Sequence, residues 1–141
     1  MDVLVPVDGS DPADSAIDHA VTHFPEANIT VLYVMDPVDG ATAWGPVTGE
    51  DWVSAAEERA ESVLAEASER AADAGHDVET ASVIGRPSQA IVEYAEEHDV
   101  DQVVIGSHGR KGVARVLLGS VAETVVRRTP SPVTVVRTPE T

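Results

Sequence analysis

Five short apolar runs alternate with stretches of helical spacing, and this alternation restricts the possible folds of the chain more than any other feature. The runs are Asp2–Val7, Asn28–Val34, Val78–Ile84, Val103–Ile105 and Pro132–Arg137. Strands that alternate with helices are joined by right-handed crossovers and form a parallel sheet covered on both faces. The 141 residues therefore predict one α/β domain, 1–141, built as a three-layer α/β/α open five-stranded parallel sheet.

Polar residues with capping chemistry mark the expected starts of two helices. Asp11 is the predicted cap of the first helix, with Pro12 at its first helical position. Ser120 is followed three residues later by Glu123, and this pair is a capping box that predicts a helix start at Ser120.

The longest helical stretch is Asp51–Ala74, and Gly75 is its expected C-terminal stop. The preceding segment, 35–50, is rich in Gly, Pro and Asp and is long for a connection between a strand and a helix. Such a segment is either a functional lid or a disordered loop.

A glycine turn, a basic loop and a helix start follow the strand Val103–Ile105. Gly106 and Gly109 come first, and Gly119 with Ser120 follows at the start of the next helix. A helix start presents unpaired N–H groups and partial positive charge to an anion, and glycine lets the backbone approach a ligand closely. The loop also carries basic side chains: Arg110, Lys111 and Arg115. These features together predict a phosphate-binding cradle.

The expected cradle lies at the carboxyl edge of the sheet. In open parallel sheets, ligands bind beyond the carboxyl ends of the strands, where the strand order reverses. Asp8 follows the first strand and Gly106 ends the fourth, so both are expected to face one pocket. Asp8 also has a purely structural interpretation, because Asp-Gly-Ser is a good turn former.

The spacing Gly106-x2-Gly109-x9-Gly119-Ser120 resembles the nucleotide-binding signature of the universal stress protein family, in its ATP-binding branch. The resemblance extends over nearly the whole chain, from Val3–Ser10 to Pro132–Val136. It implies a Rossmann-like sheet in the order 3-2-1-4-5, with ATP or another adenine nucleotide in the crevice. It also implies a homodimer that pairs through the edge strand Pro132–Arg137.

The resemblance also assigns roles to individual residues. Asp8 would hold the ribose or the adenine edge. Pro6, Val7, Val34 and Ile105 would surround the base. The ribose and phosphates would be held mostly by backbone N–H groups of Gly106, Gly109, Arg110, Gly119, Ser120 and Val121. Ser120 could instead use its hydroxyl for the helix cap. Mg²⁺ is expected to accompany the triphosphate, although no side-chain ligand for it is identifiable.

Other site classes fit the sequence less well. Lys111 is not followed by Ser or Thr, so the loop is not a P-loop, and the glycine spacing is not that of a dinucleotide fold. His19 and His23 stand four residues apart but lack a third metal ligand, so we interpret them as a solvated pair. No catalytic residue and no metal site are predicted.

Three aromatic residues near the expected site each have two interpretations. His108 is either a phosphate contact or a surface residue. Trp44 and Trp52 either cover the adenine or pack within the protein, and packing is the favoured interpretation.

The net charge of −16 argues against general binding to nucleic acid or to anionic lipid. The charge is unevenly distributed, since residues 1–101 carry 23 acidic and 3 basic residues and residues 102–141 carry 2 acidic and 6 basic ones. The positive part contains the expected phosphate site. The acidic surface is typical of a protein from a high-salt cytoplasm, where salt weakens self-repulsion. The chain has no cysteine and no apolar run of about 20 residues, so we expect a cytoplasmic protein without a membrane span.

The leading hypothesis is an ATP-binding stress-response protein in which nucleotide occupancy changes conformation or partners. Hydrolysis is expected to be slow at most, because no residue is evident to orient an attacking water. The alternative is a homodimeric protein-interaction module with a vestigial or structural nucleotide site. A third hypothesis is an enzyme, either a phosphotransferase or a nucleotide hydrolase.

Overall fold

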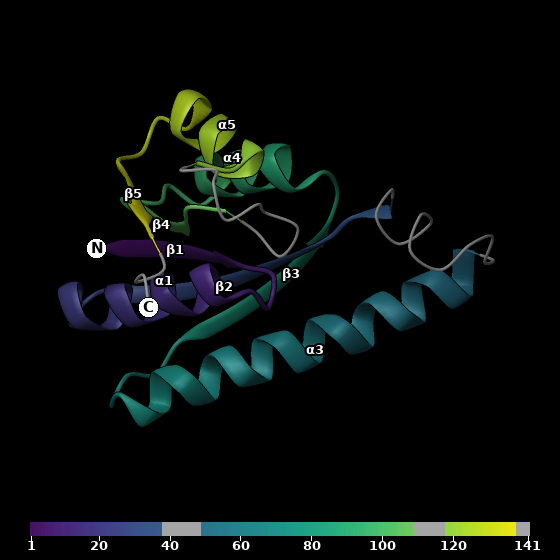
Figure 1. Cartoon of the computed structure of the whole chain (residues 1–141), viewed down its shortest axis with the longest axis horizontal. Coiled ribbons are helices and arrows are strands. Elements are labelled where there is room, and N and C mark those ends of the chain that lie inside the picture. The colour runs from purple at the N-terminus through teal and green to yellow at the C-terminus, as the bar shows by residue number, and fades with distance from the viewer. Residues whose placement is uncertain (38–48, 109–117, 138–141) are drawn as a thin grey trace.

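A five-stranded parallel sheet forms the middle layer of the protein (Figure 1). The computed structural model describes residues 1–37, 49–108 and 118–137. Its elements are β1 (Asp2–Val7), α1 (Asp11–His23), β2 (Asn28–Met35), α3 (Gly49–Asp73), β3 (Glu79–Ile84), α4 (Pro87–Glu97), β4 (Gln102–Gly106), α5 (Ser120–Arg128) and β5 (Val133–Val136). Each strand agrees with its expected bounds to within about one residue, which is the usual uncertainty of element ends.

The strand order is β3-β2-β1-β4-β5, and every neighbouring pair is parallel. This result confirms both the predicted α/β class and the order implied by the family resemblance. Helices α1 and α3 cover one face of the sheet, and α4 and α5 cover the other (Figure 1). The direction of winding reverses at β1, so the carboxyl ends of β1 and β4 flank the crevice where ligands bind in such sheets.

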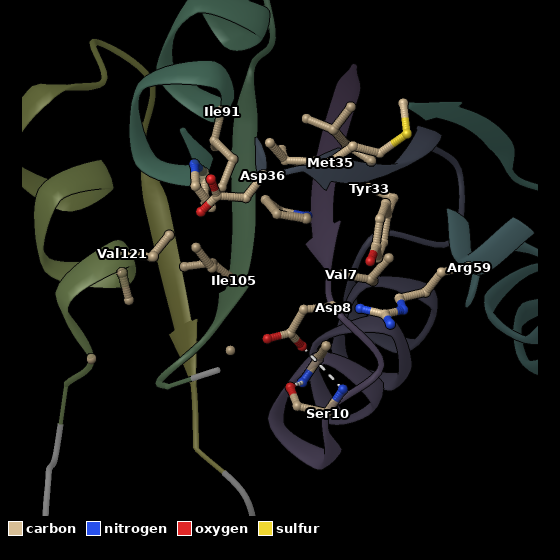
Figure 2. A pocket seen from close by; sticks show the side chains of 18 of the residues that line it. Val7, Asp8, Ser10, Tyr33, Met35, Asp36, Arg59, Ile91, Ile105 and Val121 are labelled. Carbon is tan, nitrogen blue, oxygen red and sulfur yellow. Dashed lines mark hydrogen bonds between the residues drawn. The ribbon is translucent and has the colours of Figure 1, made fainter. Parts of the chain in front are cut away.

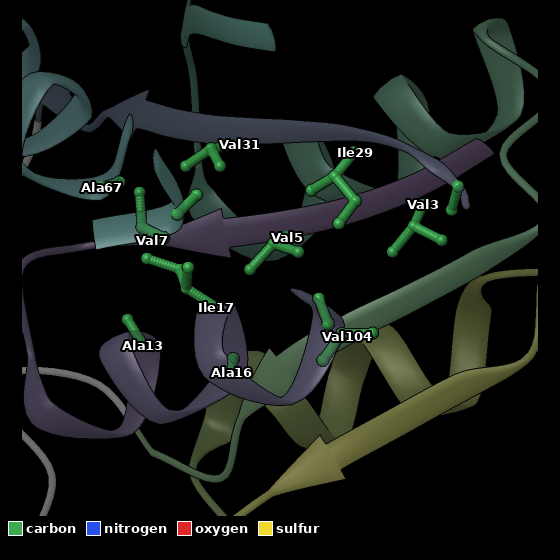
Figure 3. Close-up of a cluster of buried hydrophobic side chains, with 13 residues drawn as sticks. Val3, Val5, Val7, Ala13, Ala16, Ile17, Ile29, Val31, Ala67 and Val104 are labelled. Atoms are coloured by element: carbon green, nitrogen blue, oxygen red, sulfur yellow. The ribbon is translucent and has the colours of Figure 1, made fainter. Parts of the chain in front are cut away.

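The core has two halves because β1 is buried on both of its faces. Val5 points towards α1 and packs in one cluster with Ile17 (Figure 3). Leu4 points the other way and packs with Ile91 of α4 and Val125 of α5. A strand that contacts apolar helices on both sides must itself be apolar at every position, which explains the continuous apolar run of β1.

The cap of α1 differs from the prediction. Ser10 is the N-cap: its hydroxyl oxygen accepts a hydrogen bond from the N–H of Ala13 at 3.4 Å. Asp11 is the first residue of the helix, so the prediction that it caps α1 is wrong. The reason lies two residues before Ser10. The Asp8 carboxylate accepts the N–H of Ser10 at 3.0 Å and fixes Ser10 at the start of the helix. Ser10 is only 8% exposed in this position.

The predicted capping box at α5 is also wrong, although the helix does begin at Ser120. Gly119 is the N-cap, and no side chain caps the helix. The N–H of Gly119 donates to the carbonyl of Ser107 at the end of β4, and the N–H of Glu123 donates to the carbonyl of Gly119. This attachment to β4 determines where the helix starts, so Ser120 lies inside the first turn instead of at the cap.

The long helix α3 ends as predicted. Gly75 has a φ of +82°, which favours glycine, and the N–H of His76 donates to the carbonyl of Ala71 at 2.9 Å. A second bond, from Gly75 to Ala72, completes a Schellman motif. The helix begins at Gly49, two residues before the expected start, and residues 38–48 of the expected loop lie outside the described residues. Among the described helices, none has the length and apolar character needed to cross a bilayer.

Candidate functional site

A cavity of about 380 Å³ lies where β1, β2 and β4 end and α5 begins, with α3 along one side (Figure 2). Nine of the residues assigned from the family resemblance line it: Pro6, Val7, Asp8, Val34, Ile105, Gly106, Gly119, Ser120 and Val121. The other two, Gly109 and Arg110, lie outside the described residues. The fold therefore gathers these nine around one space, and their contact with a ligand stays a prediction.

The Asp8 side chain has a structural role at the mouth of this cavity. One carboxylate oxygen accepts the N–H of Ser10, as expected for an Asp-Gly-Ser turn. Figure 2 shows the second oxygen directed towards the middle of the cavity. A carboxylate has about four acceptor positions, so the turn and a ligand contact are compatible.

The deep wall of the cavity is apolar. Val7 of β1, Ile105 of β4 and Ile91 of α4 are labelled in Figure 2. Val34 of β2 lines the cavity as well. Val7, Ile105 and Ile91 are buried in the core, so the wall is held firmly by packing. A flat apolar ring system is the type of group that fits against such a wall.

Trp52 of α3 is half-buried and packs against a small cluster formed by Tyr33, Met35 and Ala60. This contact agrees with the favoured interpretation of Trp52 as a packing residue, and because Trp52 also lines the cavity, a contact with adenine stays a prediction. Trp44 lies outside the described residues.

Gly106 has a packing role that does not depend on a ligand. A Cβ at this position would lie 2.7 Å from the backbone carbonyl carbon of Pro12, a distance at which one of the two segments must move. A Cβ at Gly119 would lie 3.0 Å from the Cα of His108, which is also tight. The two glycines thus allow α1 and α5 to approach the end of β4, which the sequence alone did not indicate.

The first turn of α5 faces the cavity through Ser120, Val121 and Ala122. The N–H groups of a first helical turn lack partners within the helix, and they carry partial positive charge. Because Ser120 does not cap the helix, its exposed hydroxyl is not used for that purpose. The geometry therefore presents the amino end of a helix to the cavity, as a phosphate cradle requires.

Sequence reasoning missed several lining residues, among them Tyr33, Asp36 and Arg59. Asp36 directly follows β2, so the rule that led to Asp8 after β1 would also have found Asp36. Arg59 could not be found in this way, because only packing determines which face of the 25-residue helix α3 meets the cavity. Its guanidinium brings positive charge to the site from the acidic part of the sequence (Figure 2).

The two histidines of α1, His19 and His23, contact each other through their rings. The ring centroids of His19 and His23 are 4.2 Å apart, and the pKa of His19 is lowered by burial and, secondarily, by the charge of His23. Within residues 1–37, 49–108 and 118–137, no group of three or more His, Cys, Asp or Glu side chains is placed to hold a metal ion.

Comparison with known proteins gives one consistent result. A sequence model described as "Universal stress protein family" matches residues 1–137. Universal stress protein MJ0531 of Methanocaldococcus jannaschii is 34% identical over 145 residues, covering 98% of this chain and 82% of that protein. Among solved structures, MJ0577 has a TM-score of 0.82 at 28% identity and covers 99% of this chain and 97% of its own. A universal stress protein in complex with cAMP has a TM-score of 0.74 at 30% identity, with coverage of 99% and 98%.

Proposed function

Because this chain belongs to the universal stress protein family, we propose that its cavity binds an adenine nucleotide, with ATP and its Mg²⁺ as the expected ligand. The observation that carries the proposal is the cavity itself, which combines an apolar wall with the start of α5 at the carboxyl ends of β1 and β4. The related protein that holds cAMP supports the assignment of an adenine nucleotide.

The proposed arrangement follows from the chemistry of the lining. The base packs against apolar side chains of the lining, and a ribose hydroxyl donates to the Asp8 carboxylate. The residues around the base are Pro6, Val7, Val34 and Ile105. The phosphates lie at the first turn of α5, where backbone N–H groups and the helix dipole favour negative charge. Gly109 and Arg110 complete this set in the proposal. Mg²⁺ would be held mainly by phosphate oxygens and water, as is usual for this ion.

In the cell, we propose a role in the stress response in which nucleotide occupancy changes conformation or partners. A ligand shifts such an equilibrium only by its difference in affinity for the two states. Hydrolysis is expected to be slow at most. The proposed setting is a high-salt cytoplasm, with no nucleic acid or membrane as partner, in agreement with the net charge of −16.

Calorimetric titration in high salt, with ATP, ADP, AMP and adenosine, tests the proposed binding. Two variants of Ser120 test the position of the phosphates. Ser120→Glu places a carboxylate at the start of α5, where it repels phosphate but suits the helix dipole, so the fold is retained. Ser120→Gln is the matched neutral control.

We expect the wild type to bind the nucleotides. Ser120→Glu should weaken ATP binding at least about tenfold, a like-charge effect of about 1.4 kcal/mol, and should leave adenosine binding nearly unchanged. Ser120→Gln should stay within about threefold of the wild type. A folded wild type that gives no heat with any of the four compounds would overturn the proposal.

A second candidate function is a homodimeric interaction module, and the edge strand β5 favours it. The carbonyls of Pro132 and Val136 accept N–H groups from Val103 and Ser107 on the β4 side. In a strand, alternate residues direct their backbone groups to opposite sides, so Val135 directs its N–H and C=O to the open edge of the sheet. This edge is the proposed dimer contact within Pro132–Arg137.

A proline at position 135 would remove the outward N–H and leave the bonds to β4 in place. We expect Val135→Pro to be monomeric in sedimentation velocity under conditions where the wild type sediments as a dimer. Val135→Ala, which keeps the N–H and loses only side-chain packing, should remain dimeric. A dimer that persists in Val135→Pro would place the contact elsewhere, and dimers that persist without nucleotide would favour the interaction module over the nucleotide-controlled function.

A further inference from the structure

Ser107 and His108 form a hydrogen-bonded pair at the edge of the cavity. The Ser107 hydroxyl and Nδ1 of His108 are 3.2 Å apart. Ser107 is 2% exposed and is fixed through its backbone, because its N–H donates to the carbonyl of Val136 at 2.8 Å and its carbonyl accepts the N–H of Gly119. One buried serine therefore ties together the end of β4, the end of β5 and the start of α5, and its side chain holds the neighbouring imidazole.

His108 lies against the proposed phosphate position. It lines the cavity, and its Cα is the nearest atom to a Cβ built on Gly119, the cap residue of α5. With Nδ1 bonded to Ser107, Nε2 is the ring nitrogen that remains to meet a ligand. The place where helix α5 begins thus carries a side-chain donor or acceptor in addition to its backbone N–H groups.

The chemistry of the pair favours a donor at Nε2. A serine hydroxyl both donates and accepts, so it satisfies Nδ1 whether that nitrogen carries a proton or not. In the neutral ring that accepts the serine O–H, Nε2 carries the hydrogen. In the protonated ring both nitrogens donate. An anion accepts hydrogen bonds, so an anion at Nε2 favours the two ring forms in which Nε2 carries a hydrogen. These forms are the neutral ring with its hydrogen on Nε2 and the protonated ring.

We propose that His108 is a further ligand-binding residue, whose Nε2–H donates to a phosphate oxygen of the bound nucleotide, and that Ser107 is its positioning residue. This inference rests on the proposed function, because it needs a nucleotide in the cavity. It adds a side chain to a phosphate site built otherwise from backbone groups. It also makes phosphate binding sensitive to proton concentration, because protonation of the ring gives a stronger, charge-assisted bond.

Among the described residues that line the cavity, one is a histidine, His108. The charged side chains around the cavity are carboxylates and guanidiniums, among them Asp8, Asp36 and Arg59 in its lining, Asp11, Asp14 and Asp18 of α1, Glu123, Arg127 and Arg128 of α5, and Arg137 after β5. In model peptides these two kinds of group titrate outside the interval from pH 6 to 8, where imidazole titrates. Because the wild type and the His108 variants share these groups, a difference between them in how affinity changes with pH reports on His108.

The test measures the dissociation constants of AMP and adenosine at pH 6 and pH 8 for the wild type and three variants. His108→Gln keeps an N–H donor near the position of Nε2, whereas His108→Asn places its amide near Nδ1. Ser107→Ala removes the hydroxyl and keeps both backbone bonds. Far-UV circular dichroism confirms folding of each protein, and ratios to the wild type at each pH cancel the titration of the AMP phosphate.

At pH 8 we expect His108→Asn to weaken AMP binding about threefold to tenfold, as the loss of a neutral hydrogen bond does, and His108→Gln to stay within about threefold. At pH 6 we expect AMP to bind His108→Asn and His108→Gln about tenfold to a hundredfold more weakly than the wild type. Neither amide can form the charge-assisted hydrogen bond that a protonated ring gives. Ser107→Ala should show a smaller loss of the same sign. Adenosine should bind all four proteins alike.

Nitrogen NMR of the histidine rings gives a second readout that a merely structural role would not move. Addition of AMP to the wild type should increase the hydrogen-bearing state of Nε2 of His108, and Ser107→Ala should reduce that response. AMP affinities equal within about twofold in His108→Asn and the wild type at both pH values would overturn the inference. The proposed function would survive that result, and it would fail only if the wild type bound no nucleotide.

Discussion

Replacement of Gly106 by alanine separates the structural role of this residue from its proposed role at the ligand. The added Cβ would lie 2.7, 2.8 and 2.9 Å from the carbonyl carbon, the Cβ and the carbonyl oxygen of Pro12. Two of these three atoms belong to the backbone, so no side-chain rotation relieves the contact. To restore a separation of about 3.5 Å, α1 must move away from β4 by about 0.8 Å.

Such overpacking costs about 1–3 kcal/mol in well-packed cores. We therefore expect Gly106→Ala to lower the free energy of unfolding by about that amount without any nucleotide present. The matched control is Gly85→Ala, because a Cβ there would meet the Cβ of Ala90 at 3.5 Å, an ordinary contact. This control should stay within about 0.5 kcal/mol of the wild type.

Urea unfolding in high salt, followed by far-UV circular dichroism, measures both differences. An unchanged slope of free energy against urea would show that the variants differ in stability and not in the extent of unfolding. If Gly106→Ala were as stable as Gly85→Ala, the packing argument would be refuted. The glycine would then matter only for the approach of a ligand.

Three further predictions concern the stability of the chain without ligand. Ser10→Ala should lower the free energy of unfolding by about 1 kcal/mol, because it removes the cap on the N–H of Ala13, while Ser120→Ala should change it by only a few tenths; equal losses in urea unfolding would contradict the assigned caps. The folded state lowers the pKa of His19, so the stability associated with this group is complete above about pH 6.5 and is lost as the pH falls through the lowered value. His23→Gln should reduce that loss, since the charge of His23 is its second cause after burial, and the same pH dependence in variant and wild type would count against the coupling. Finally, the net charge of −16 predicts that stability rises steeply with KCl concentration, whereas full stability in dilute buffer would remove the case for a high-salt protein.

The sheet could be predicted because its signal is repeated in every strand. Leu4 and Val5 point to opposite faces of β1 and both meet helices, so burial requires apolar residues throughout the strand. The rule for ligand crevices indicated that the first and fourth strands are neighbours. The full strand order came from the family resemblance, because hydrophobic periodicity contains no information on which strands pair. Its agreement with the structure shows that the resemblance covers the fold and not only the glycine signature.

Helix caps were harder to predict because neighbouring residues compete for the same role. Ser10 and Asp11 are both good caps, and the choice between them depends on the bond from Ser10 to Asp8. At α5 the sequence Ser-x-x-Glu is a valid capping box, but the bond from Gly119 to Ser107 makes Gly119 the N-cap and leaves Ser120 as the first helical residue. Both errors come from contacts that local patterns do not encode.

The candidate site was predictable where it follows strand ends and glycines, and not where it depends on packing between elements. Arg59 faces the cavity only because α3 packs on β2 with one particular rotation. The contact of Gly106 with Pro12 joins segments that are distant in sequence. The hydrogen bond between Ser107 and His108 depends on the rotation of their side chains. These features could be recognised only after the chain was folded.

The position of a bound nucleotide is the most direct test of the account. A crystal structure of the chain grown with ATP and Mg²⁺ in high salt should show the base against Pro6, Val34 and Ile105 and the phosphates at the first turn of α5. A nucleotide bound at another surface, or a cavity without nucleotide at a concentration that saturates binding in solution, would contradict it.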